Sequence, residues 1–124
     1  MDPARLAMIL AVLERKVGLG VAGCDVFVNI AGGVRVDEPA LDLPVALAVA
    51  SSLRDRPVPF DVIAFGEIGL AGEVRGVARA QARLAEAAAM GFRRAIVPFS
   101  SGAGGDIQVS GVRTVEEALG AISS

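Results

Sequence analysis

Residues 36–53, VDEPALDLPVALAVASSL, constrain the fold more than any other stretch of this chain. A β-like run ends in acidic residues and a proline, and a long Ala, Val and Leu segment typical of a buried helix follows. Such a corner places side chains at the positive end of the helix dipole, where proteins often hold reactive groups. The corner consists of Glu38, Pro39, Ala40, Leu41 and Asp42. It has no Ser, Cys or His, so it is either an active site or only the shell of one.

The remaining pattern predicts alternating helices and strands. Helices are expected at about residues 2–16, 42–53, 79–90 and 115–122, with Asp2 capping the first and Thr114 with Glu117 forming a capping box for the last. Strands are expected at residues 24–30, 34–36, 61–65, in a hairpin over 66–77, at 93–98 and at 106–109. This order indicates a single α+β domain with a mixed sheet, with residues 100–105 as a flexible loop.

Composition limits the classes of function. The chain of 124 residues is 53% hydrophobic and only 4% aromatic, without Trp or Tyr, which favours a folded domain and argues against modules that stack bases on exposed aromatic rings. Its net charge of −2 gives no overall attraction to DNA or to a membrane, so DNA binding would need a local basic patch. No signal peptide or membrane span is evident, and we expect a cytoplasmic location with no membrane partner.

Side chains able to carry out catalysis are scarce. Histidine is absent and Cys24 is the only cysteine, which excludes a Ser-His-Asp triad, an internal disulfide and a usual Cys/His zinc site. Cys24 is expected to be a small core residue. The acids Asp37, Glu38 and Asp42 are expected to occupy a solvated turn, with Asp42 as the helix N-cap, and a metal or acid/base pair is the alternative. The arginine spacing by itself favours a solvated face with local ion pairs, such as Arg83 with Glu86, over a phosphate-binding patch.

Three long stretches resemble one family. They are DVFVNIAGGVRVDEPALDLPVALAVASSL (25–53), PVPFDVIAFGEIGLAGEVRGV (57–77) and RLAEAAAMGFRRAIVP (83–98). They resemble the C-terminal Lon-protease-like domain of the RadA (Sms) family of bacterial RecA paralogues, which act in recombinational DNA repair. The resemblance covers essentially the whole chain and implies a Lon-type domain over residues 2–124. The family's zinc-finger and RecA-like ATPase domains have no counterpart here, so zinc and ATP are expected in those domains and no cofactor in this one.

The resemblance also implies how the corner is used. In Lon proteases the equivalent corner reads like D-G-P-S-A-G, and its serine is activated by a lysine on a later helix. Alignment on the shared GEI motif places the serine position on Ala40 and the lysine position on Arg83. Alanine has no nucleophilic atom, and arginine remains protonated and cannot act as a base. We therefore expect no enzyme activity and no catalytic residue, only vestigial dyad positions.

The leading hypothesis is an inactive scaffold that forms a homo-hexamer and adds a basic DNA-binding surface to a branch-migration ATPase. Sixfold repetition would turn a few positive charges into a strong, salt-sensitive surface for single-stranded or branched DNA. A RecA-like recombinase is a further candidate partner. The alternative is an oligomerisation scaffold that has no DNA contact of its own. The candidate DNA-binding residues are Arg5, Arg15, Lys16, Arg79, Arg83, Arg35, Arg54, Arg56 and Arg75.

Overall fold

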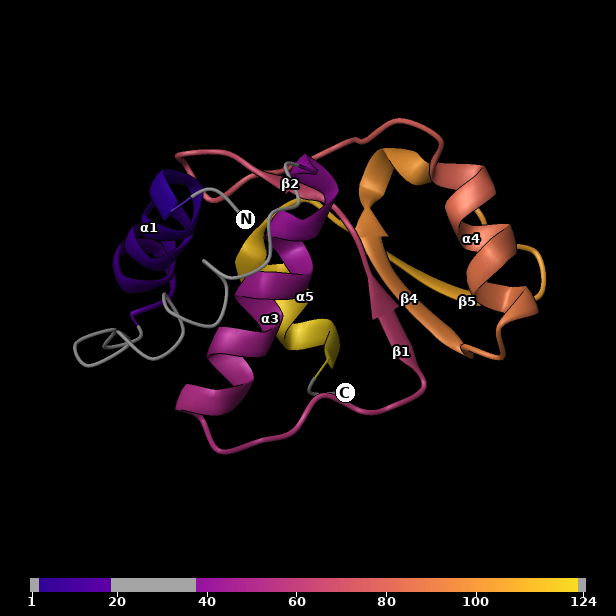
Figure 1. Ribbon diagram of the computed structural model, residues 1–124, viewed down its shortest axis with the longest axis horizontal. Coiled ribbons are helices and arrows are strands. Elements are labelled where there is room, and N and C mark those ends of the chain that lie inside the picture. Colours follow the sequence, from indigo (N-terminus) through magenta and orange to yellow (C-terminus); the bar gives the residue numbers. More distant parts are fainter. Residues whose placement is uncertain (1–2, 19–37, 123–124) are drawn as a thin grey trace.

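The computed structural model describes residues 3–18 and 38–122 (Figure 1). Helix α1 (Pro3–Val12) continues as one π-helical segment, η1 (Leu13–Val17), and ends at Gly18 in the left-handed conformation. The predicted first helix is thus confirmed, including its glycine stop. Several other predictions lie outside the described residues. They concern the cap Asp2, the strands at 24–30 and 34–36, the core residue Cys24, the acid Asp37 and the candidate Arg35.

The described strands form two sheets. A parallel sheet has the order β1 (Val62–Ala64), β4 (Arg94–Pro98) and β5 (Gln108–Val112). A separate antiparallel pair consists of β2 (Glu67–Ile68) and β3 (Val74–Arg75). The predicted α+β class, with both kinds of strand pairing, is confirmed. The last strand ends at Val112, three residues beyond the predicted end at 109.

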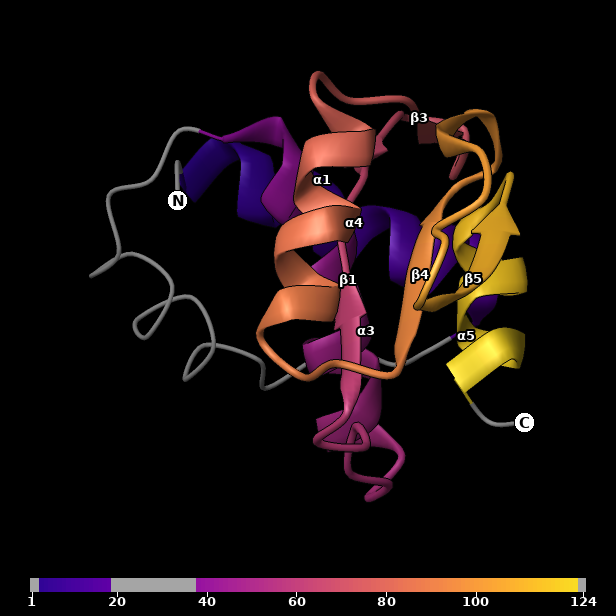
Figure 2. The same cartoon turned by 90° about the vertical axis from the view of Figure 1, so that its right-hand side faces the viewer.

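Helices cover both faces of the parallel sheet. On one face lie α3 (Asp42–Leu53) and α5 (Val115–Ile122), with α1 packed on their outer side, and on the other lies α4 (Ala80–Ala89) (Figures 1 and 2). Because side chains alternate along a strand, the central strand β4 contributes to both resulting cores. Ile96 packs with the three-helix side, and Ala95 and Val97 pack with α4.

The corner lies at the carboxyl edge of this sheet, which we define as the end where β1, β4 and β5 finish. A short 3₁₀ turn, η2 (Pro39–Leu41), leads into α3, and a second one, η3 (Phe99–Ser101), follows β4. The Gly66 amide donates to the Ala40 carbonyl at 2.9 Å, and the Leu43 amide donates to the Gly66 carbonyl at 3.0 Å. The end of β1 therefore fixes the corner, and ligand sites of parallel sheets commonly lie at this edge.

The capping of α5 leads to a stability prediction. The Thr114 hydroxyl accepts the Glu117 amide at 3.1 Å, while the Glu117 carboxylate accepts the amide of Arg113 at 3.0 Å. We expect Thr114→Ala to lower the free energy of unfolding by about 1 kcal/mol, because one amide at the helix start loses its acceptor. Thr114→Ser keeps the hydroxyl and should retain most of the stability. Urea unfolding measures both, and equal losses for the two variants would contradict the capping role.

Candidate functional site

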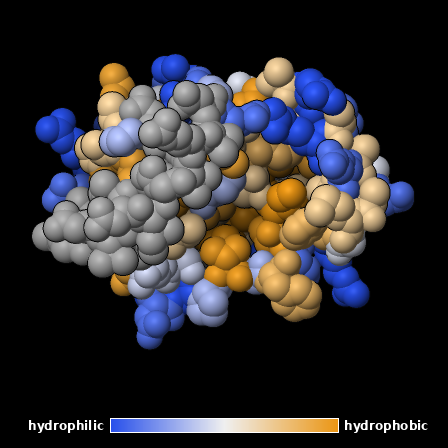
Figure 3. Space-filling model, viewed as in Figure 1, coloured by the Kyte–Doolittle hydropathy of each residue, from blue (hydrophilic) through white to orange (hydrophobic). Residues whose placement is uncertain are grey.

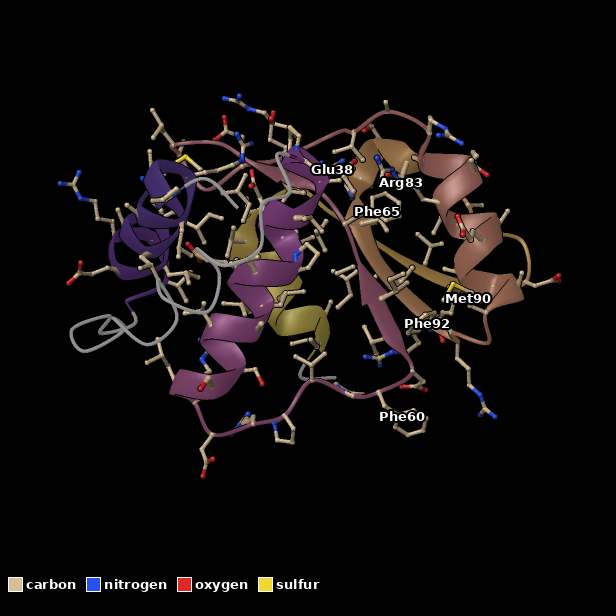
Figure 4. All side chains as sticks on the ribbon, in the orientation of Figure 1. Glu38, Phe60, Phe65, Arg83, Met90 and Phe92 are labelled. Atoms are coloured by element: carbon tan, nitrogen blue, oxygen red, sulfur yellow. The ribbon has the colours of Figure 1, made fainter. Side chains whose placement is uncertain are left out.

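A pocket of about 260 Å³ opens at the carboxyl edge, and we call it the corner pocket. It is lined by Glu38, Pro39, Ala40, Glu67, Gly76, Val77, Ala78 and Arg83. The two positions singled out from the sequence, Ala40 and Arg83, thus line one pocket although they are far apart in the chain. Figure 4 shows Glu38, Arg83 and Phe65 close together between the start of α3 and α4.

Ala40 contributes only a methyl group to this pocket. It is 2% exposed and packs in the same core cluster as Phe65. The backbone beneath it depends on Gly66, whose φ of +154° is rare for residues with a side chain and whose surroundings would crowd one. A Cβ at Gly66 would lie 3.0 Å from Val74 Cγ1. The corner is therefore rigidly built, but its central side chain offers no oxygen or sulfur.

Arg83 is held by three contacts. It forms an ion pair with Glu38, donates from Nε to the Ala78 carbonyl at 2.9 Å, and lies over the Phe65 ring at 5.9 Å from the centroid. The predicted pairing with Glu86 is wrong, because Arg83 pairs instead with Glu38 at the corner. A guanidinium has only hydrogen-bond donors, and the Glu38 carboxylate and the Ala78 carbonyl supply the acceptors for Arg83.

Asp42 is a buried ion-pair partner and not the solvated helix cap that the sequence predicted. Its side chain is fully buried, and its carboxylate accepts Arg5 Nε at 2.5 Å, Arg5 Nη2 at 2.7 Å and the Ile68 amide at 3.0 Å. The capping prediction is wrong because the turn η2 precedes α3 and leaves Leu41 at the N-cap position. Asp42 then lies inside the helix and points toward α1 and β2.

Two further carboxylates extend this pair into a network, which we call the arginine–carboxylate network. It consists of Arg5, Asp42, Glu67, Arg75 and Glu73. Arg5 also contacts Glu67 at 3.0 Å, and Arg75 contacts Glu73 at 3.0 Å. The hydrogen bond to Asp42 raises the pKa of Arg5 above its usual range, and the hydrogen bond from Arg75 lowers the pKa of the exposed Glu73. Two candidate DNA-binding arginines are thus bound to carboxylates.

Other candidate cations lie where η1 and α3 end. Lys16 and Arg54 line one pocket of about 320 Å³, together with Glu116, and Arg54 and Arg56 line another of about 210 Å³. We call Lys16, Arg54 and Arg56 the basic end. Arg15 is exposed next to it, whereas the exposed Arg79 lies at the start of α4. Within residues 3–18 and 38–122, the cations of the basic end form no ion pair, and neither do Arg15 and Arg79.

Sequence reasoning did not single out Glu67 as the residue that joins Arg5 to Arg75. No local spacing signal places Glu67 beside α1, because the contact with Arg5 spans 62 positions. The described residues contain no group of three or more Cys, Asp or Glu side chains arranged to hold a metal ion. Among the same residues, no helix is both long enough and apolar enough to cross a membrane.

Comparison with known proteins gives one family and a consistent set of relatives. A family model described as subunit ChlI of Mg-chelatase matches residues 7–101. The chain is 52% identical over 122 residues to the DNA repair protein RadA of Escherichia coli K12, covering 96% of this chain and 26% of that protein. It is 50% identical over 125 residues to RadA of Pseudomonas aeruginosa, covering 98% and 28%. The chain thus spans about a quarter of the length of the curated relatives it matches.

The burial of Asp42 leads to a second prediction. Arg5→Met should lower the free energy of unfolding by about 3–5 kcal/mol, because it leaves a buried carboxylate without its cation. Arg75→Met is the matched control on the exposed side of the network and should cost less than about 1 kcal/mol. Adding Asp42→Asn to Arg5→Met removes the unpaired charge and should recover a substantial part of the loss. Urea unfolding measures the free energy of unfolding of all three variants. Equal losses for Arg5→Met and Arg75→Met would contradict the buried-pair interpretation.

Proposed function

This chain belongs to the family described as subunit ChlI of Mg-chelatase, and we propose that it is an inactive Lon-like domain of a DNA repair protein. Its role would be to hold a cytoplasmic ring of subunits together, as a hexamer, and to contact DNA. The identity of about 50% to RadA proteins along the whole chain supports the assignment to DNA repair. Because the chain corresponds to about a quarter of those proteins, the repair activity of the whole protein is part of the proposal.

The composition of the corner pocket carries the proposal of an inactive protease. Ala40 and Arg83 share that pocket, so the positions aligned with a Lon nucleophile and base face the same space. A serine and a lysine at these two places would bring a hydroxyl and an amine to one pocket, whereas the pocket now has a methyl group and a guanidinium. Glu38 and Phe65 hold the Arg83 guanidinium in place, which favours a structural role for it.

Protease assays test this part directly. The wild-type chain should release no peptides from casein and should not react with serine-directed labels. Ala40→Ser should remain inactive, because Arg83 cannot take the proton from the new hydroxyl. A thermal unfolding curve that matches the wild type would show that the variant folds. Cleavage above background by either protein would contradict the proposal.

The proposed DNA contact is supported by the cations that the described part of the fold leaves without a carboxylate. Lys16 and Arg54 come from different helices and line one pocket, so the fold concentrates positive charge that the sequence scatters. Glu116 offsets part of this charge within one subunit. Repetition around a ring would let the assembly neutralise more phosphates at once, and binding would then fall steeply with salt.

The pure scaffold is the second candidate, and the arginine–carboxylate network favours it. Arg5, Arg75 and Arg83 already neutralise carboxylates, so they have less charge to offer to phosphates. If DNA contact depended on these three, the domain would have to break existing ion pairs to bind. The two candidates therefore differ in whether the cations of the basic end touch DNA.

A salt titration separates them. We expect the combined Lys16→Gln, Arg54→Gln and Arg56→Gln variant to bind DNA more weakly and with a shallower salt dependence. The slope of log affinity against log salt should shrink by about 0.7–0.9 for each phosphate that the variant no longer neutralises. Arg75→Gln is the control, because this arginine already pairs with Glu67 and Glu73.

Light scattering on the same samples reports assembly. Rings that form yet retain no DNA at low salt would favour the pure scaffold. An unchanged salt slope in the triple variant would show that the basic end does not contact DNA.

A further inference from the structure

An arginine–aromatic stack lies at the carboxyl edge, outside the corner pocket. Phe99 follows β4 and Arg113 follows β5, and the pairing of Pro98 with Val112 makes them neighbours across the sheet. The Arg113 guanidinium lies 3.7 Å from the centroid of the Phe99 ring. Phe99 is nevertheless 58% exposed, so much of this large apolar side chain faces solvent. The contact with Arg113 holds the ring in place, and the exposed part of the ring remains available to a ligand.

A hollow of about 350 Å³ adjoins the ring. Glycines at positions 102, 104, 105 and 111 form much of its wall, and Phe99, Ala103, Ile107 and Val109 complete it. At two of these glycines, Gly104 and Gly111, the packing would crowd a side chain. A Cβ at Gly111 would lie 3.1 Å from Phe99 Cα, and one at Gly104 would lie 2.5 Å from Ile107 Cγ2. The result is an open hollow beside the ring, with a wall of bare backbone and small apolar side chains against which a planar group could pack.

The loop that forms the hollow is tied to α4. Gln81 Nε2 donates to the Ser101 carbonyl at 2.7 Å and to the Ala103 carbonyl at 3.1 Å. This tether brings the exposed Arg79, at the start of the same helix, to the same edge of the sheet. Hydrophilic side chains gather over the start of α4, beside apolar side chains in the middle of the face (Figure 3). Asp106 is the one acidic residue of the loop, and it is exposed and does not line the hollow.

We propose that Phe99, Arg113 and the adjoining hollow bind an unpaired base of single-stranded DNA, with the base stacked on the ring. The inference rests on the proposed DNA-binding function and specifies a site and a strand type for it. A nucleotide joins a flat ring to a negative phosphate, and this edge offers a partly exposed aromatic ring beside a guanidinium group. The low aromatic content argues against a module lined with several rings, but one exposed ring suffices to stack one base.

The first test uses the absence of tryptophan from the chain. Phe99→Trp introduces a single fluorophore, whose emission should be quenched by a short thymidylate oligomer as a base stacks on the indole. An oligomer of the same length without bases, and a duplex hairpin whose bases are already stacked, should leave the emission nearly unchanged. Quenching by the thymidylate oligomer alone supports the site, and equal quenching by the abasic oligomer contradicts it.

The second test measures affinity by the fluorescence anisotropy of labelled oligomers. Phe99→Leu should weaken binding of the thymidylate oligomer by about 5- to 150-fold and leave binding of the abasic oligomer unchanged. Phe60→Leu is the matched control, since Phe60 is 96% exposed and lies at the opposite end of β1 (Figure 4). Unfolding curves of both variants should match that of the wild type.

The outcomes distinguish this inference from the function on which it rests. If Phe99→Leu binds the thymidylate oligomer as tightly as the wild type, the stacking site is wrong while DNA binding stands. If the wild type retains neither oligomer at low salt, both proposals fail. A loss of affinity confined to oligomers that carry bases supports the stacking site.

Discussion

The ion pair between Arg5 and Asp42 anchors the start of α3, the helix that follows the corner. The Asp42 carboxylate has no access to water, so its charge depends on Arg5 from α1 and on the Ile68 amide from β2. These contacts join three segments that are far apart in the chain and hold the first turn of α3 against them. Ala40 and Glu38 precede this turn, and Arg83 reaches Glu38 from α4. The corner pocket therefore depends on a buried charge that would be unstable without its partner, as well as on the backbone hydrogen bonds of Gly66.

Local sequence signals predicted the elements well, because they report interactions within a few residues. Gly18, Gly91 and Thr114 ended or began helices where the pattern placed them. Asp42 was mispredicted for the converse reason. An acid at a helix start is usually a cap, and only the arrival of Arg5, 37 positions away, makes it a buried ion. The pairing of Ala40 with Arg83 in one pocket came from resemblance to a family, since no spacing rule joins a corner to a helix beyond the next hairpin.

The same distinction applies to the positive charges. From sequence the candidate arginines look alike, but the fold divides those in the described residues into some that neutralise carboxylates and some that remain exposed. Arg5, Arg75 and Arg83 stabilise the domain by pairing, whereas Lys16, Arg54 and Arg56 gather where helices end. With a net charge of −2, the proposed contact with DNA would depend on this uneven distribution of charge.

The position of β4 between two cores affects how the domain unfolds. Its alternate side chains belong to both cores, so the α4 layer and the three-helix layer share one strand and neither has a complete apolar core without it. Separate melting of the two layers would expose one side of that strand to water. The domain should therefore lose its structure in one cooperative transition, and damage to either layer will lower the melting temperature of the whole.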